Sequence, residues 1–303
     1  MSRYDRSTRF IIICFLFLLS TFLWKHAVFT GLNQVHKSVT QPGVDHRLPA
    51  DWLSSNREQM SVYDLINISC KVRRRDYEVL LISHGGSGST DGFNFFYEKF
   101  GMNSSALNDV SDQDGLKHNP YPTLLKTMKK CLLSAKVVIY QFADPVQAVF
   151  SLFRRGFWPE HFKKLEPRFL VEHLREQMMT NLSAYASTGK DLLGLRAHIE
   201  SYLIGATHSE YPIVFLNSAT RLNNGTLQKL YTVFGEFGVK MTRNYLMLSQ
   251  DSNTDSQKNS VSSTRYENAT GCDLLKQTYA ELSSLLDNLG DVSLAYKGTL
   301  WKL

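Results

Sequence analysis

Glycines and hydroxyl side chains follow directly after a short apolar run in the first third of the chain. The run Val79-Leu80-Leu81-Ile82 predicts a strand, and the sequence continues Ser83-His84-Gly85-Gly86-Ser87-Gly88-Ser89-Thr90. Glycine permits unusual dihedrals and close backbone approach, and a helix that begins after such a turn presents N–H groups and the positive end of its dipole. This arrangement is typical of sites that bind a phosphate-like anion, and the predicted binding residues are Gly85, Gly86, Ser87, Gly88, Ser89 and Thr90.

A second apolar run leads into a second helix start. Val137-Val138-Ile139-Tyr140 is followed by Gln141-Phe142-Ala143-Asp144-Pro145, where Asp144 is a typical N-cap and Pro145 a typical first helical residue. Two such transitions in one sheet are suited to hold the two ends of a nucleotide. The predicted residues at the second end are Asp144, Ser151, Arg154 and Arg155.

Two common enzyme classes are disfavoured by what these motifs lack. A Walker A loop ends in Gly-Lys followed by Ser or Thr, and no lysine follows the glycines here, so an ordinary ATP- or GTP-hydrolysing enzyme is not expected. His84-Gly85-Gly86 is similar to the oxyanion-hole turn of lipases and esterases. The chain contains no Gly-x-Ser-x-Gly pentapeptide, however, which excludes that hydrolase class.

The second transition resembles the 3′-phosphate-binding segment of the sulfotransferases that use 3′-phosphoadenosine 5′-phosphosulfate (PAPS). In that family a strand ends in Arg-Asp-Pro and a serine follows eight positions after the Arg; Ala143-Asp144-Pro145 and Ser151 match this spacing. The first transition resembles the family's 5′-phosphosulfate loop, with Ser87-Gly88-Ser89-Thr90 as its last residues. The resemblance covers most of residues 77–235. It implies a P-loop-like α/β fold, PAPS as co-substrate without a metal, and transfer of the sulfuryl group to an acceptor.

Two cations of the family pattern are absent from this chain. Gly86 stands where the family usually has a Lys, and Ala143 stands where it has an Arg. Arg154 and Arg155 follow Ser151 by three and four positions, so at least one guanidinium is expected to reach the same phosphate. The alternative for both arginines is a solvated helix end, where cations also suit the dipole.

Transfer to a hydroxyl acceptor requires a base. The developing charge and the in-line geometry would be handled mostly by positioning and electrostatics, as in phosphoryl transfer. A group must also take the proton of the acceptor. The candidate bases are His84, at the end of the first strand, and His161, after the arginine pair.

The elements that must position these residues alternate between strand and helix. A third apolar run, Ile213-Val214-Phe215-Leu216, follows further helical segments. Near-continuous apolar strands separated by helices are typical of a parallel sheet covered on both faces. The predicted fold is therefore α/β, with three layers and a mainly parallel sheet. The expected helices cover residues 91–100 and 123–133, a segment that begins at Pro145 and contains Ser151, part of 169–206, and 273–289.

The N-terminus predicts a membrane anchor. An apolar run from Phe10 to Trp24 is preceded by Arg3, Arg6 and Arg9, and no good cleavage site follows it. We therefore expect a cytoplasmic tail at 1–9, a signal-anchor helix at 10–32, a stem at 33–76 and a lumenal head at 77–303. Glycosylation sequons support the lumenal side; they are Asn67, Asn103, Asn181, Asn224 and Asn268.

Cysteines and charge add weaker constraints. Beyond the apolar segment the chain has Cys70, Cys131 and Cys272, which in an oxidising lumen allow one bridge with one thiol left over, and the pairing stays open. The formal net charge is +6, but lysines and arginines are spread along the chain, which favours no nucleic-acid partner. The run Arg73-Arg74-Arg75 is interpreted as a solvated cluster at the edge of the head, with contact to an acidic ligand as the alternative.

The sequence thus predicts a single-pass type II Golgi membrane protein with a lumenal sulfotransferase head. Its compartment makes a glycan the favoured acceptor, with other secretory-pathway molecules as alternatives. A sulfotransferase-like binding protein without activity stays open because of Gly86 and Ala143. A type II glycosyltransferase fits the topology but lacks a clear Asp-x-Asp motif; the nearest match, Asp112-Gln113-Asp114, is expected to lie in a loop.

Overall fold

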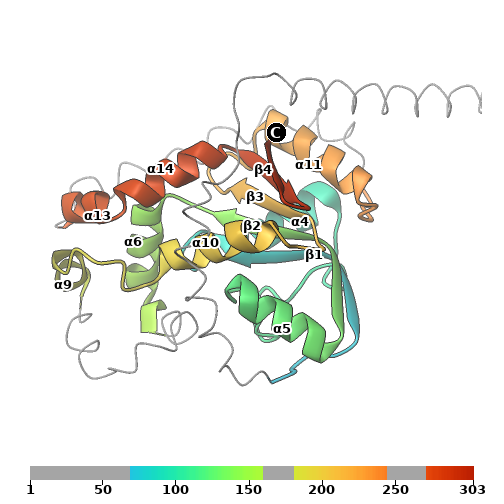
Figure 1. Cartoon of the computed structure of the whole chain (residues 1–303), viewed down its shortest axis with the longest axis horizontal. Helices are drawn as coiled ribbons and strands as arrows, with labels where there is room; N and C mark the ends of the chain where they lie inside the picture. Colours follow the sequence, from blue (N-terminus) through green and yellow to red (C-terminus); the bar gives the residue numbers. More distant parts are fainter. Residues whose placement is uncertain (1–68, 160–180, 244–270) are drawn as a thin grey trace, which may run out of the picture. The chain divides into compact units, whose positions relative to one another are not determined.

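Five strands form one mixed sheet in the computed structural model, which describes residues 69–159, 181–243 and 271–303 (Figure 1). The spatial order follows the chain order. The first three strands pair in parallel and the last two antiparallel. The strands are β1 (Arg75–Ser83), β2 (Leu133–Phe142), β3 (Ile213–Asn217), β4 (Val292–Tyr296) and β5 (Thr299–Lys302).

The carboxyl ends of the parallel strands lie at one edge of the sheet. Ser83 at the end of β1 is paired with Gln141 in β2, and Phe142 at the end of β2 is paired with Asn217 at the end of β3. Segments that leave these strands therefore begin side by side. Ligands of open α/β sheets bind at this edge, which is where both predicted anion-binding segments start.

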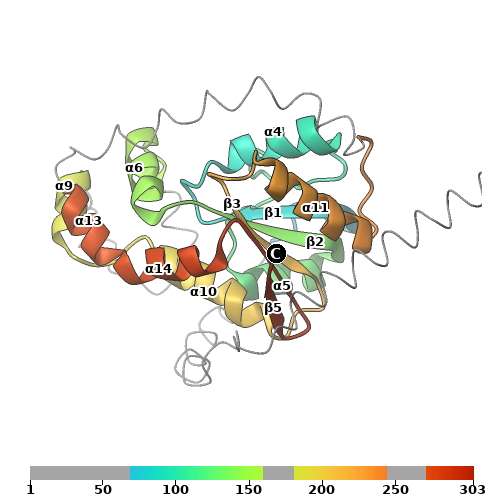
Figure 2. The ribbon, with the colours of Figure 1, turned by 90° about the horizontal axis from the view of Figure 1, so that it is seen from above.

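Helices cover both faces of the sheet. Side chains from alternate positions of the same strand enter opposite cores, as Leu80 and Leu81 do, and both are fully buried. This two-sided burial is the reason the parallel strands read as continuous apolar runs. Figure 2 shows α4 (Ser89–Phe100) and α11 (Asn224–Glu236) on one face. The other core takes side chains from α5 (Tyr121–Cys131), α6 (Pro145–Arg155), α9 (Leu182–Ser187), α10 (Leu195–Ala206), α13 (Cys272–Thr278) and α14 (Ala280–Leu289).

The α/β class and the three predicted parallel strands are confirmed, but the C-terminal part was predicted wrongly. The expected helix over 273–289 is divided into α13 and α14, which meet at Tyr279. The hairpin of β4 and β5 was not foreseen, because each strand is short and the turn at Lys297 and Gly298 interrupts the apolar pattern. The sheet is consequently mixed rather than mainly parallel.

Several predictions concern residues outside the described ranges. The tail, the anchor at 10–32, nearly all of the stem, His161, Asn67 and Asn268 all lie there. Within residues 69–159, 181–243 and 271–303, no helix has the length and apolarity needed to cross a membrane. All described residues belong to one unit, Arg47–Leu303, while the other unit, Met1–His46, falls in the part left undescribed.

A disulfide resolves the cysteine pairing that the sequence left open. Cys70, just before β1, is bonded to Cys131 at the end of α5, and Cys272 is a buried free thiol. The bridge closes a loop with a sequence separation of 61 residues. That loop contains the Gly-rich turn and the whole segment between α4 and α5.

Removing the bridge should destabilise the head. In the Cys70→Ala/Cys131→Ala variant we expect the free energy of unfolding to fall by about 2–4 kcal/mol, since the unfolded chain regains loop entropy. Urea unfolding of oxidised protein measures the change. Cys272→Ala is the control, because it leaves the bridge in place. Non-reducing peptide mapping that finds Cys272 cross-linked to either partner would contradict this pairing.

Candidate functional site

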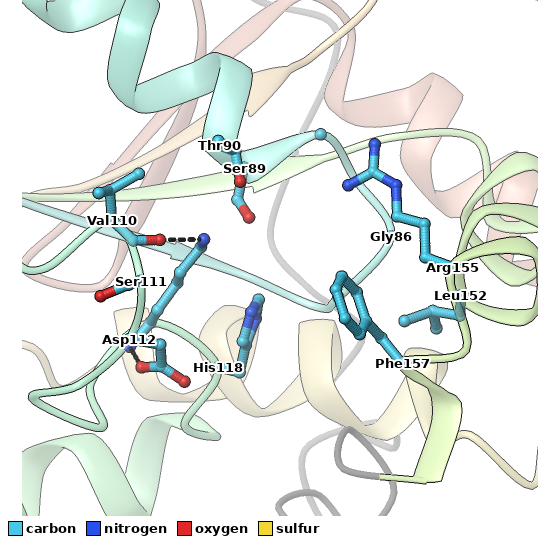
Figure 3. Close-up of a pocket in the computed structure, with 13 residues that line it drawn as sticks. Gly86, Ser89, Thr90, Val110, Ser111, Asp112, His118, Leu152, Arg155 and Phe157 are labelled. Atoms are coloured by element: carbon cyan, nitrogen blue, oxygen red, sulfur yellow. Dashed lines mark hydrogen bonds between the residues drawn. The ribbon is translucent and has the colours of Figure 1, made fainter.

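A cavity of about 330 Å³ opens at the carboxyl edge of the parallel strands (Figure 3). Three segments form its walls: the Gly-rich turn with the start of α4, the loop between α4 and α5, and the last turn of α6 with the residues after it. Its lining residues are Gly85, Gly86, Gly88, Ser89, Thr90, Val110, Ser111, Asp112, Lys117, His118, Leu152, Arg155 and Phe157.

The Gly-rich turn is built so that only glycine fits at its centre. Gly86 and Gly88 have φ values of 79° and 72°, a region that side chains with a Cβ rarely adopt. A Cβ on Gly86 would also lie 2.3 Å from the carbonyl oxygen of Ala148 in α6. The turn therefore rests directly on the α6 backbone, and the lysine that the family pattern has at this position would not fit.

The start of α4 presents backbone donors to the cavity. Gly88 is the N-cap, without a side-chain capping bond, and the first backbone bond of the helix runs from the N–H of Gly92 to the oxygen of Gly88. The first N–H groups of a helix have no partner within it. Ser89 and Thr90 line the cavity at this helix end, so the start of the helix faces the cavity.

A buried glutamine supports the turn from below. The side-chain amide of Gln141 donates to the oxygen of Ser87 at 2.9 Å, and its packing requires Gly92, where a Cβ would lie 2.0 Å from the Gln141 Oε1 atom. Two buried oxygens here, Ser87 Oγ and Gln141 Oε1, have no hydrogen-bond partner among the described residues. Ser87, unlike its neighbours in the motif, does not line the cavity.

The loop between α4 and α5 brings a lysine to the opposite wall. Its backbone is folded by its own carboxylates: Asp112 accepts the N–H of Lys117 at 2.9 Å, and Asp114 accepts the N–H groups of Asp109 and Leu116. The Lys117 side chain is 5% exposed, donates to the oxygen of Val110 at 2.8 Å and lies over the Phe93 ring at 5.3 Å. An ammonium group is thus held in the cavity wall.

The next residue, His118, has its ring fixed by the end of β1. Its Nδ1 lies 2.8 Å from the backbone oxygen of Ser83. A carbonyl oxygen only accepts, so Nδ1 carries the proton and the lone pair of the neutral ring is on Nε2. Figure 3 shows the ring directed into the cavity.

Helix α10 holds the backbone around His118. The oxygen of His118 accepts from Nε2 of His198 at 3.3 Å, and the oxygen of Asn119 accepts from the Tyr202 hydroxyl at 2.7 Å. Nδ1 of His198 then accepts from the hydroxyl of Tyr140 in β2 at 2.8 Å. Burial, with His84 and His118 nearby, holds the pKa of His198 well below its usual value, so this support carries no charge at neutral pH.

The third wall comes from the end of α6. The helix stops at Gly156, and Arg155 and Phe157 on either side of it both line the cavity. In Figure 3 these two side chains stand across the cavity from Val110 and Ser111. Phe157 is 58% exposed, which is unusual for a large apolar side chain. The cavity therefore combines a cation and an aromatic face at one side of its mouth.

The structure separates the predicted second group of binding residues. Asp144 caps α6 as expected, with its carboxylate accepting the N–H of Gln147 at 2.8 Å. Arg155 lines the cavity, whereas Asp144, Ser151 and Arg154 do not. The two arginines, equivalent in the sequence, thus face different surroundings.

His84, the described candidate base, is enclosed. Its side chain is 1% exposed, and it is not part of the cavity wall. Nδ1 lies 3.1 Å from the oxygen of Gly85, while Nε2 is buried without a hydrogen-bond partner in the described ranges. Burial lowers its pKa to about 4. A histidine placed in this way supports the turn and does not meet an acceptor in the cavity.

Sequence reasoning missed Lys117 and His118. The signal was the polar run Asp112-Gln113-Asp114-Gly115 before them, since aspartates at this spacing fold onto nearby backbone N–H groups and make an ordered turn. This run lies in a loop, as predicted. Its carboxylates serve the backbone of the loop.

Three predicted glycosylation sites are described. Asn103, Asn181 and Asn224 are all exposed, as a glycan acceptor must be. No group of three or more His, Cys, Asp or Glu side chains in the described part of the chain is arranged to hold a metal ion. Comparisons with family models, with curated proteins and with solved structures found no match to this chain.

The contact of Gly86 with α6 predicts a strong substitution effect. Gly86→Ala should lower the free energy of unfolding by about 1–2 kcal/mol for the left-handed dihedral and roughly 1–3 kcal/mol more for the overlap with Ala148. Gly156→Ala is the matched control, since Gly156 also has a positive φ but its Cβ position meets no atom within 4 Å from the described residues beyond its neighbours in the chain. Urea unfolding compares them, and equal losses would contradict the contact.

The low pKa of His84 predicts acid sensitivity. The unfolded state takes up a proton near pH 6.5, whereas the folded state does so only near pH 4. Stability from the neutral ring is therefore present above pH 6.5 and lost as the pH falls toward 4. His84→Asn should flatten the dependence of the unfolding free energy on pH in this window. The pH dependence that remains should come from His198, whose pKa is also lowered. An NMR titration in which the His84 ring titrates near pH 6.5 would refute this.

Proposed function

We propose that the chain is a PAPS-dependent sulfotransferase of the secretory pathway that transfers a sulfuryl group to a hydroxyl of a glycan or another secretory-pathway acceptor. One observation carries the proposal: Lys117 and Arg155, from two separate segments, line the same cavity as the Gly-rich turn. They supply positive charge where Gly86 and Ala143 do not. The cavity thus has the anion-binding backbone and the cations that phosphosulfate chemistry needs.

The residues present fit the co-substrate at its phosphosulfate end. Gly86 and Gly88 leave a backbone cradle without side chains, and the start of α4 offers unpaired N–H groups. The buried Ser87 hydroxyl beneath the cradle has no partner among the described residues. A small movement of the turn on binding would let this hydroxyl join the anion-binding donors.

Each cation has a distinct role in this proposal. PAPS supplies the activated sulfuryl group, and the chain orients it. Lys117 lies across the cavity from α6 and would stabilise the negative charge that develops on the leaving phosphate oxygen. Arg155 lies at the end of α6 and would bind a phosphate through its planar guanidinium.

His118 replaces His84 as the proposed base. Because its Nδ1–H donates to the oxygen of Ser83, the neutral ring carries its lone pair on Nε2, the atom that would take the proton of an acceptor hydroxyl. The bonds from His198 and Tyr202 to the backbone at 118 and 119 fix where that lone pair lies. His118 and Lys117 are adjacent in the chain, so base and cation reach the cavity together.

The proposed setting is the Golgi lumen, with the head held by the N-terminal anchor. The disulfide between Cys70 and Cys131 is typical of an oxidising compartment. The exposed positions of Asn103, Asn181 and Asn224 support the same side of the membrane.

Ligand binding tests the co-substrate. Adenosine 3′,5′-bisphosphate should raise the melting temperature of the full chain more than ADP or a UDP-sugar does. Lys117→Met should weaken its binding about ten- to hundredfold, as expected for a lost charge-assisted contact. Arg155→Gln should weaken it roughly tenfold, whereas Arg154→Gln, the matched control, should bind like wild type. An equal response to ADP would rule out the 3′-phosphate assignment, and a preferred UDP-sugar would favour a glycosyltransferase.

Transfer of labelled sulfate tests the base. His118→Gln should bind adenosine 3′,5′-bisphosphate normally but lose most of its kcat, by about 100-fold or more. His84→Asn should retain kcat when it is assayed at a temperature at which the variant stays as fully folded as wild type. Normal binding with no transfer by wild type to any hydroxyl acceptor would instead indicate a sulfotransferase-like binding protein.

A further inference from the structure

Four exposed cations gather at the edge of the sheet opposite the cavity. Lys71, Arg73 and Arg74 precede β1, and Lys129 lies in the last turn of α5. We name these four residues the basic track. The sequence alone favours a solvated cluster for the arginine run, because nothing in it indicates that α5 lies beside these residues.

The fold holds the two parts of the basic track together. The disulfide joins Cys70 to Cys131, and the N–H of Arg74 donates to the oxygen of Cys131 at 2.9 Å. Arg74 and Leu132 both have positive φ, at 51° and 56°. Positive φ is uncommon outside glycine, so the chain accepts an unfavourable backbone here to bring these segments side by side.

Nearby charges are engaged in other contacts. Arg75, the third arginine of the run, donates to the backbone oxygens of Ser104 and Leu107 and lies over the Tyr77 ring at 4.7 Å. Glu78 is paired with Lys136 at 2.8 Å. Arg75 therefore has a structural role, and Glu78 is not available to neutralise the basic track.

Lys71 extends from the basic track to the loop between α4 and α5, other residues of which line the cavity. Its ammonium nitrogen lies 3.7 Å from the position that a Cβ on Gly115 would occupy. Gly115 is two residues before Lys117, in the loop that lines the cavity. The nine residues of β1 separate the two edges of the sheet by roughly 25 Å. A long anionic chain could therefore contact the basic track and still reach the cavity.

We propose that the basic track binds an acidic glycan, a polysaccharide carrying carboxylate or sulfate groups, as the extended part of the acceptor. This inference rests on the proposed function and narrows its acceptor class. Guanidinium groups pair with carboxylate and sulfate oxygens through two parallel hydrogen bonds. Repeated anionic groups along a glycan match cations spread over two segments.

The structure favours a glycan over an acidic peptide or an anionic membrane. A peptide would need backbone partners, but the free edge of β1 is covered: the N–H groups of Glu78 and Val79 donate to the oxygen of Ala106, and Val79 pairs with Leu107. A membrane surface would leave the position of Lys71 against Gly115 unexplained. A glycan uses both the basic track and its link to the cavity.

The experiment measures binding of a fluorescent heparin-derived decasaccharide to the full chain in neutral detergent. Lys71→Gln/Arg73→Gln/Lys129→Gln should bind it about tenfold more weakly and with less dependence on salt. Lys190→Gln/Lys276→Gln/Lys302→Gln is the matched control, since it removes three exposed cations elsewhere and should bind like wild type. Arg74 is left unchanged because of its positive φ. Melting temperatures confirm that both variants fold.

Three results would overturn the proposal. One is equal binding of the decasaccharide by the two triple variants. Another is binding of a neutral dextran oligomer by wild type that is as strong as its binding of the decasaccharide. The third is stronger competition by a decaglutamate peptide, or by phosphatidylserine added to the micelles, than by unlabelled decasaccharide. The stabilisation by adenosine 3′,5′-bisphosphate should be the same in both triple variants. If glycan binding fails these tests, the co-substrate assignment still stands. If adenosine 3′,5′-bisphosphate does not stabilise the protein, the decasaccharide measurement can still be interpreted by itself.

Discussion

The contact between Gly86 and the carbonyl oxygen of Ala148 determines how the parts of the cavity are arranged. A Cβ on Gly86 would lie 2.3 Å from that oxygen, so no side chain fits between the Gly-rich turn and α6, and the two segments are fixed against each other. Asp144 and Pro145 start α6 at a defined residue, and eleven residues later the helix delivers Arg155 to the cavity. A glycine at 86 is therefore needed for packing, and under the proposed function the positive charge beside the turn has to come from another segment.

That segment is held by a buried polar network rather than by apolar packing alone. Lys117 and His118 lie in a loop folded by aspartates, and α10 binds the backbone that follows through His198 and Tyr202. The two bonds from α10 join segments far apart in sequence, and the disulfide closes the same region. Networks of this kind define a single geometry when every member is paired. By contrast, three buried side-chain atoms around the turn, at His84, Ser87 and Gln141, have no hydrogen-bond partner among the described residues.

The sequence was sufficient for features that depend on neighbours along the chain. The three parallel strands, the cap at Asp144 and the Gly-rich turn followed from apolar runs and capping chemistry. Features that depend on distant contacts could not be predicted. Arg155 lies on the side of α6 that faces the cavity and Arg154 does not. Lys117 reaches the cavity because its loop returns along β1, where the Asn108 side chain bonds the backbone N–H and oxygen of Leu81. No spacing rule encodes such a return.

The position of the cations bears on how a degenerate motif should be interpreted. Under the proposed function, a lysine within the turn and a lysine on a facing loop would place the same charge beside the same anion, and electrostatic stabilisation depends on that placement rather than on chain position. Loss of the motif lysine would abolish the chemistry only if no other cation reached the site. The glycine at 86 also lets α6 approach the turn closely, and α6 carries Arg155 to the cavity. Under the proposed function, the absence of the usual lysine and the presence of Arg155 thus follow from one packing arrangement, whereas Lys117 is brought to the cavity by the loop that returns along β1.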